Sequence, residues 1–371
     1  MSPLGETIRS MIETEGPLPF DQFMQLALGH PQHGYYMSRD PFGARGDFVT
    51  SPEISQMFGE LLGLWAAETW ARIGCPSSLR LVELGPGRGT LMADALRACQ
   101  VAPEFMKSLA EVCLVETSAV LRKIQEDKLA DYDGPLGWYD SLDQVPPGPT
   151  IFIANEFFDA LPVRQFIRVE EGWCEKLVGV NEDGTFFFGL SPEPDPLIHA
   201  PAPVGYVLEI GAAGHQFAAS LAARIADHGG AAIIVDYGHT QTTYGETVQA
   251  MRNHRAVDPL SDPGECDITA HVDFASLARA ANATGARVFG PITQADFLNR
   301  LGIVQRAEAL KRNASPLQGI KISRELTRLT STAEERGASG ATVPGMGALF
   351  KALAIIEPNA EAPPGFEPRE R

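Results

Sequence analysis

Glu83-Leu84-Gly85-Pro86-Gly87-Arg88-Gly89-Thr90 is the stretch that decides the fold of this chain. The apolar run Leu79 to Leu84 predicts a short buried strand, and a helix is expected from about Thr90 to Cys99. A strand that ends in closely spaced glycines lets a ligand approach the backbone, and the following helix directs its N-terminal N–H groups at that ligand. The stretch therefore predicts an α/β fold with a ligand site where the first strand ends.

Strands and helices alternate after this stretch. Buried strands are expected at Val112 to Val115, Ile151 to Ala154 and Ala231 to Val235, with helices between them. Such alternation predicts a Rossmann-like parallel sheet with helices on both faces. The β-rich stretch from about 164 to 203 contains an Asp-Gly turn and is interpreted as an insertion.

The segments at both ends are expected to flank this sheet. Residues 1–75 predict a helical region, with two helices separated by the breaker Gly16-Pro17-Leu18-Pro19 and a long helix from Ser51, its N-cap, to about Ile73. The α/β domain is assigned to residues 76–356, and residues 357–371 to a disordered tail. The polar segment 237–267 is expected to be a long loop, and whether it moves as a lid is left open.

Composition excludes several classes of function. The formal net charge of −17 disfavours nucleic acid and anionic membrane surfaces as partners and suits a cationic protein segment. The five cysteines are scattered and never form a C-x-x-C pair, so neither a disulfide framework nor a metal site is expected. No apolar run approaches the length of a membrane span, and the acidic first residues do not resemble a secretory signal or a transit peptide. The sequence therefore favours the cytoplasm.

Two classes of cofactor use a loop of this kind. Dinucleotide-binding folds favour Gly-x-Gly-x-x-Gly with an acid about 20 residues later. Here the last glycine comes one place early, at Gly89, and the acid that ends the second strand, Glu116, lies 31 residues beyond Gly85. Together with Glu83, the pattern resembles motif I of class I methyltransferases, which bind S-adenosylmethionine. A nicotinamide-dependent oxidoreductase is the disfavoured alternative, and a turn that merely packs strand on helix is the simplest one.

That resemblance implies roles for several side chains. Glu83 would lie near the methionine amino group, and Glu116 would accept hydrogen bonds from the ribose hydroxyls. Asp140 would meet the adenine amino group, although a cap or a solvated turn fits this residue equally well. The residues expected to bind the cofactor are Glu83, Gly85, Pro86, Gly87, Gly89, Thr90, Glu116 and Asp140.

The acceptor side is expected in Asn155-Glu156-Phe157-Phe158-Asp159-Ala160-Leu161-Pro162, which follows the strand at Ile151 to Ala154. Enzymes that methylate adenine carry a Pro-Pro pair here, and this chain does not. Two carboxylates can hold a guanidinium by paired hydrogen bonds and take up its proton. Asn155, Glu156 and Asp159 are therefore the candidate catalytic residues. The alternative is that the two acids only cap a following helix.

Four strings together resemble the MidA-like family of S-adenosylmethionine-dependent methyltransferases: 46–53, 83–90, 155–162 and 236–238. The resemblance runs from about residue 4 to 356, and the family includes mitochondrial assembly factors of the respiratory NADH dehydrogenase. It implies arginine methylation of a subunit of that complex outside the membrane. It also implies that region 1–75 folds over the cofactor, with Thr50 and Ser51 in the pocket. Since the N-terminus departs from the mitochondrial members, a bacterial cytoplasmic homologue is expected, and the mitochondrial matrix only if a presequence is missing.

Other features are left with modest interpretations. A non-catalytic assembly factor that retains the cofactor fold remains an alternative, and a homodimer is compatible with the sequence. The polar run from Gly264 to Asp273 suits strand-end capping or acceptor binding. The basic residues Lys311-Arg312 and those from Lys321 to Arg328 are interpreted as a solvated helix face.

Overall fold

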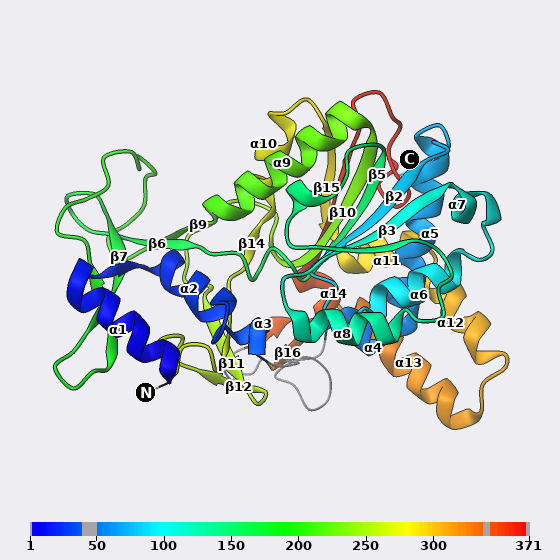
Figure 1. Ribbon diagram of the computed structural model, residues 1–371. Helices are drawn as coiled ribbons and strands as arrows, with labels where there is room; N and C mark the ends of the chain where they lie inside the picture. The colour runs from blue at the N-terminus through cyan, green and yellow to red at the C-terminus, as the bar shows by residue number, and fades with distance from the viewer. Residues whose placement is uncertain (1, 39–49, 337–341, 369–371) are drawn as a thin grey trace.

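The computed structural model describes residues 2–38, 50–336 and 342–368 (Figure 1). Its centre is an eight-stranded sheet with the order β15-β18-β10-β5-β2-β3-β4, and β14 pairs with β10 off this path. The strands are β2 (Leu79–Leu84), β3 (Leu109–Val115), β4 (Leu136–Tyr139), β5 (Thr150–Asn155), β10 (Gly230–His239), β14 (Val272–Asp273), β15 (Arg287–Thr293) and β18 (Phe350–Ile356).

The sheet is mixed rather than wholly parallel. Strands β10, β5, β2, β3 and β4 run parallel to one another, as the alternation of strands and helices predicts. Strand β18 lies antiparallel between β10 and β15. All seven of its residues are buried, so the last strand of the chain lies inside the sheet and not at its edge. The prediction of a purely parallel sheet is wrong at this position, because strand direction depends on pairing that no local pattern records.

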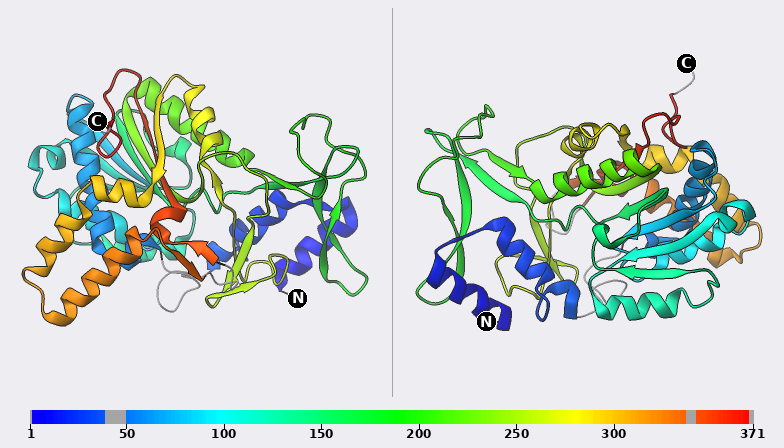
Figure 2. Two further views of the ribbon diagram at one scale, coloured as in Figure 1. Left: turned by 180° about the vertical axis from the view of Figure 1, so that it is seen from behind. Right: turned by 45° about the horizontal axis from the view of Figure 1, so that its top comes forward.

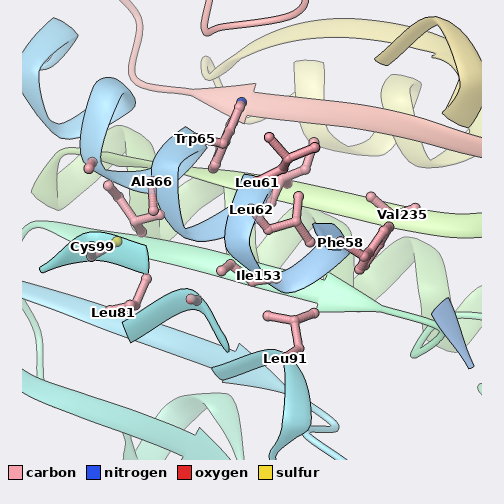
Figure 3. Packing of buried hydrophobic residues seen from close by; sticks show 14 of the residues in the cluster. Phe58, Leu61, Leu62, Trp65, Ala66, Leu81, Leu91, Cys99, Ile153 and Val235 are labelled. Carbon is pink, nitrogen blue, oxygen red and sulfur yellow. The ribbon is translucent and has the colours of Figure 1, made fainter. Parts of the chain in front are cut away.

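Helices cover both faces of the sheet. Alternate side chains of its strands point to opposite faces, and each face packs into its own apolar core. One face is covered by α5 (Gln56–Arg72), α6 (Thr90–Cys99) and α11 (Gln294–Arg300), and the other by α9 (Ala212–His228) and α10 (Phe274–Asn282). Figure 3 shows Phe58 and Leu62 of α5 packed with Ile153 of β5 and Val235 of β10. The strand β2 and the helix α6 have the predicted boundaries, so the glycine loop lies where the sequence places it.

The predicted long helix from Ser51 is divided into two. A short α4 (Ser51–Ile54) precedes α5, and Thr50 rather than Ser51 occupies the N-cap position. Ser55 leaves the helical conformation with φ −157°, and its Oγ accepts a hydrogen bond from Met57 N at 3.4 Å. Ser55 therefore caps the start of α5. Its side chain competes with the helix for backbone hydrogen bonds, and the spacing of apolar residues cannot reveal this.

The β-rich insertion and the N-terminal helices form one lobe beside the main sheet (Figure 2). Its sheet has the order β1-β7-β6-β9, with β8 paired to β7. The breaker predicted between the first two helices forms β1 and pairs with β7. The elements are α1 (Pro3–Glu15), β1 (Leu18–Pro19), α2 (Phe20–Gly29), α3 (Tyr35–Ser38), β6 (Arg164–Arg168), β7 (Trp173–Val180), β8 (Phe186–Leu190) and β9 (Val207–Ile210). The lobe therefore combines parts of the chain that the sequence divides between two regions.

Segment 237–267 is structured, contrary to the expected long loop. Strand β10 extends to His239, and a three-stranded sheet with the order β12-β11-β13 follows. Its strands are β11 (Gln249–Arg252), β12 (Arg255–Val257) and β13 (Asp267–Thr269). The strands are short and separated by glycine and proline, so the sequence pattern favours a loop there.

The C-terminal part contains more order than expected. Helices α12 (Ile303–Lys311) and α13 (Pro316–Thr330) lead through β16 (Glu334–Arg336), β17 (Thr342–Pro344) and α14 (Met346–Leu349) to β18. The expected disordered tail packs on the domain up to residue 368: Trp65 Nε1 donates to Pro364 O at 3.1 Å, and Phe366 contacts Phe297. In the part of the chain that the structure describes, no helix has the length and apolar character to cross a membrane.

Candidate active site

The glycine loop between β2 and α6 needs glycine for two reasons. Gly85, Gly87 and Gly89 have φ values of 61°, 52° and 75°, which side chains strongly disfavour. A Cβ on Gly85 would also lie 2.9 Å from Cδ2 of Phe157, so a side chain there would force the Phe157 ring to move. The loop lies beside a cavity of about 590 Å³ at the carboxyl ends of the parallel strands, a size that suits a nucleoside-like ligand.

Acidic side chains follow the second and third parallel strands at this cavity. Glu116 is buried, and its carboxylate accepts hydrogen bonds from Ser118 N at 2.8 Å and from Gln125 Nε2 at 3.3 Å. Burial raises the pKa of Glu116. Asp140 is exposed, pairs with Arg122 Nη2 at 2.6 Å and also lines the cavity. The two residues thus lie where a ribose and a base could be held.

Glu83 faces a separate small cavity of about 40 Å³, which Pro86 and Thr90 also line. Its carboxylate is buried, and Oε2 has no hydrogen-bond partner among the described residues. Burial raises the pKa of Glu83 well above its usual value. A buried carboxylate with one oxygen unpaired suits a cationic group of a ligand, because the opposite charge would stabilise its ionised form.

The N-terminal region reaches the site through Thr50 and Ser51. Thr50 lines both cavities. Ser51 is fully buried and lines neither, but its backbone N–H donates to Glu156 Oε1 at 2.9 Å. The structure therefore places Ser51 behind Glu156 rather than in the expected pocket. Residues 46–49 of the same motif lie outside the described residues.

Glu156 holds its carboxylate at the cavity in a strained backbone conformation. Its φ is 51°, which is rare for a residue other than glycine and which persists only where surrounding contacts enforce it. Asn155 is buried, and its Nδ2 donates to Glu156 Oε1 at 3.0 Å. Burial raises the pKa of Glu156, so the carboxyl combines a fixed position with an increased affinity for a proton.

Asp236, which lies on β10, organises the turn that carries Glu156 and Asp159. Its Oδ2 accepts hydrogen bonds from the N–H groups of Phe157, Phe158 and Asp159 at 3.2, 2.9 and 3.2 Å. Burial, together with the charge of Glu156, raises the pKa of Asp236 to about 8. The turn leads into β6 and not into a helix, so the alternative that Glu156 and Asp159 cap a following helix is wrong.

Two buried acids from distant parts of the chain lie on the wall of the same cavity. Asp159 and Asp267 both line it, together with Tyr36 and Tyr237. Burial raises the pKa of Asp159 well above its usual value, and the charges of Asp236, Asp267 and Glu156 raise it further. Sequence reasoning missed Tyr36 and Tyr237, and it left Asp267 in a polar run with two interpretations. The density of acids in that run was the available signal.

Comparisons with known proteins agree with this geometry. Residues 61–292 match the model of a family described as "Putative S-adenosyl-L-methionine-dependent methyltransferase". The chain belongs to this family. A relative from Danio rerio, named protein arginine methyltransferase NDUFAF7, mitochondrial, is 40% identical over 83% of this chain and 79% of its own length. The Homo sapiens protein of the same name is 37% identical over 84% of this chain and 76% of its own length.

Solved structures give the same result. A protein from Burkholderia thailandensis, crystallised with S-adenosyl-homocysteine, superposes with a TM-score of 0.84 at 28% identity, covering 99% of this chain and 94% of that one. A second crystal structure, of a protein from the same organism, superposes with a TM-score of 0.82 at 30% identity. It covers 99% of this chain and 95% of that one.

The site of this methyltransferase fits S-adenosylmethionine. The glycine loop leaves room for close backbone approach, Glu116 offers two acceptor oxygens for a diol, and Glu83 offers a carboxylate for an ammonium group. The alternative of a nicotinamide-dependent oxidoreductase is therefore set aside. The individual residue assignments remain proposals.

Proposed function

We propose that this methyltransferase transfers a methyl group to the guanidinium of an arginine side chain in another protein. The observation that carries the proposal is the set of three acids, Glu156, Asp159 and Asp267, on the wall of the cavity that the glycine loop also lines. Three carboxylates around one space favour a cationic acceptor with several N–H donors. The names of the relatives from Danio rerio and Homo sapiens support arginine as the residue.

The acids would bind the guanidinium and keep it planar. Asp159 and Asp267 are 7% and 4% exposed, so a cation that enters the cavity meets carboxylates with little competing water. Arrival of the positive charge favours the ionised form of each acid, and so opposes the burial and the repulsion that raise the pKa of Asp159. Arginine recognition and ionisation of the acids are therefore coupled.

Glu156 and Asp159 are the candidates for accepting the proton that the guanidinium releases. The chemistry needs a base because the free guanidinium has a pKa above about 12 and its lone pairs are delocalised. S-adenosylmethionine, when bound, supplies the electrophilic methyl group on its sulfonium. Ser51 N and Asn155 Nδ2 both donate to Glu156 Oε1, so this carboxyl is held in place on the wall of the cavity.

The acceptor protein and the cellular location remain proposals. Resemblance to assembly factors favours a subunit of the respiratory NADH dehydrogenase as the acceptor. The names of the relatives contain the word mitochondrial, and a cytoplasmic location for this chain stays a prediction. The net charge of −17 supports a protein rather than a nucleic acid as partner, and a homodimer stays a prediction.

The test is transfer of a labelled methyl group from S-adenosylmethionine to purified subunits of that complex, followed by amino-acid analysis of the labelled protein. We expect the label in methylarginine. Label in lysine, or in a carboxyl ester, would overturn the assignment of the acceptor while leaving the methyltransferase in place.

A further inference from the structure

A second, larger hollow adjoins the active-site cavity. Its volume is about 1000 Å³, and its walls are residues of α12, α13, the β16–β17 pair and α14. Leu349 and Phe350 line both this groove and the active-site cavity, so the two are neighbours on the surface. Figure 1 shows α13 and α14 on the side of the sheet that also carries β16.

The groove is basic in a protein that is strongly acidic as a whole. Lys311, Arg324, Arg328 and Arg336 line it, and no aspartate or glutamate does so among the described residues. Lys311 pairs with Glu308 at 2.9 Å. The three arginines are exposed and form no ion pair with any residue that the structure describes. Three uncompensated cations in one groove contrast with the formal net charge of −17.

Helix α13 accounts for only part of this arrangement. Arg328 lies in its last turn, where a cation is favoured, but Arg324 stands four residues before it, where like charges repel and destabilise a helix. The solvated-face interpretation explains neither their position along a groove nor the lack of acidic partners. A partner that supplies negative charge would explain both.

Apolar side chains also line the groove, which favours a polypeptide over a nucleic acid. They are Ile320, Val343, Met346, Leu349 and Phe350, and Ile320 is 51% exposed. A phosphate backbone would gain nothing from these apolar side chains, and the acidic remainder of the surface would repel it. A peptide can place apolar and acidic side chains on one face.

We propose that this groove docks the segment that flanks the target arginine of the acceptor protein, and that this segment carries acidic side chains. The inference rests on the proposed arginine methylation and adds a rule for substrate choice. The arginine would enter the acidic cavity while its acidic neighbours lie on Arg324, Arg328 and Arg336. Because the cavity is acidic and the adjoining groove is basic, the two together would fix which residue of the bound segment enters the cavity.

Two synthetic peptides test the rule on the full chain. Each contains a single arginine, flanked on both sides by glutamates in one peptide and by glutamines in the other. We expect the unmodified protein to show a KM about tenfold lower for the acidic peptide. The double variant Arg324→Glu, Arg328→Glu should lose this preference, and high salt should weaken it because exposed charges are screened. Lys321→Glu, which changes the charge as much as the single variant Arg324→Glu, is the control, because Lys321 lies on the same helix outside the groove and pairs with Glu325.

The outcomes separate the two proposals. Equal KM values for both peptides, or an equal loss in the double variant and in Lys321→Glu, would overturn the inference while arginine methylation stands. If neither peptide is methylated, fluorescence anisotropy in the presence of S-adenosyl-homocysteine measures binding alone. An arginine-dependent preference for the acidic peptide there supports the groove independently of the reaction. Stronger displacement of that peptide by RNA than by unlabelled acidic peptide would also overturn the proposal.

Discussion

The hydroxyl of Tyr36 donates a hydrogen bond to Asp267 Oδ1 at 2.7 Å, although 231 positions separate the two residues. Tyr36 lies on α3 in the N-terminal lobe, and Asp267 begins β13 of the small sheet. Both line the cavity. The bond therefore joins two separate additions to the α/β domain at the point where we propose that the arginine binds.

Removal of this hydroxyl should weaken acceptor binding more than cofactor binding. In Tyr36→Phe, Asp267 loses a donor that fixes its position, so we expect kcat/KM for the acceptor to fall roughly tenfold. The dissociation constant of S-adenosyl-homocysteine should not change. Tyr244→Phe is the control, because its hydroxyl bonds to Pro201 O outside the cavity. Equal effects of both substitutions would contradict a role for Tyr36 at the acceptor.

Neutral substitutions of the acceptor acids should stop methyl transfer while the cofactor still binds. Glu156→Gln and Asp159→Asn keep the shape of the side chain and remove the proton acceptor, which costs about 10²- to 10⁴-fold in rate where general-base catalysis operates. Calorimetry with S-adenosyl-homocysteine measures the cofactor separately. Unchanged methyl transfer in both variants would remove these residues from the mechanism.

Local patterns in the sequence were sufficient for the central part of the fold. The buried run Leu79–Leu84, the glycine loop and the helix after it depend on neighbouring residues, and each lies where it is predicted. Acids that directly follow a parallel strand, such as Glu116 and Glu156, also lie at the cavity, because those strands end at one edge of the sheet.

Features that depend on distant contacts could not be predicted in this way. The direction of β18 follows from its position between two other strands. The order of residues 357–368 follows from contacts such as Trp65 with Pro364, 299 positions away. Asp267 lies on a small sheet outside the main one, so the rule about strand ends did not apply to it. Each of these is a tertiary relationship without a local signature.

A side chain at Gly87 should block the cofactor. Gly87 lines both cavities and has φ 52°, so Gly87→Val introduces bulk and strain at the loop. We expect loss of measurable S-adenosyl-homocysteine binding in calorimetry and loss of methyl transfer, with circular dichroism unchanged. Gly205→Val is the control, since Gly205 has φ 89° and no atom near its missing Cβ. Intact assembly function in a Gly87→Val protein that lacks methyl transfer would favour the non-catalytic alternative.

The packed C-terminal segment should contribute to stability. Phe366 is 8% exposed and contacts Phe297, so Phe366→Ala should lower the free energy of unfolding by about 3 kcal/mol. Thermal denaturation measures the effect, with Pro368→Ala at an exposed position as the control. Equal melting temperatures for the variant and the unmodified protein would indicate that the segment does not pack in solution.

The acceptor acids should make the ligand-free protein less stable as the pH rises. The folded-state pKa of Asp159 is raised by burial and by neighbouring acids, so the folded protein holds a proton there that the unfolded chain releases near pH 4. The free energy of unfolding therefore falls by about 1.4 kcal/mol for each pH unit between the unfolded-state pKa and the raised folded-state pKa, and it levels off above the latter.

In Asp159→Asn this loss disappears, so the inactive variant should melt at a higher temperature than the unmodified protein at pH 8 and at the same temperature near pH 4. Glu182→Gln, at an exposed turn, controls for the removal of one negative charge. A constant difference in melting temperature across this pH range would show that the ionisation of Asp159 is not opposed by its surroundings.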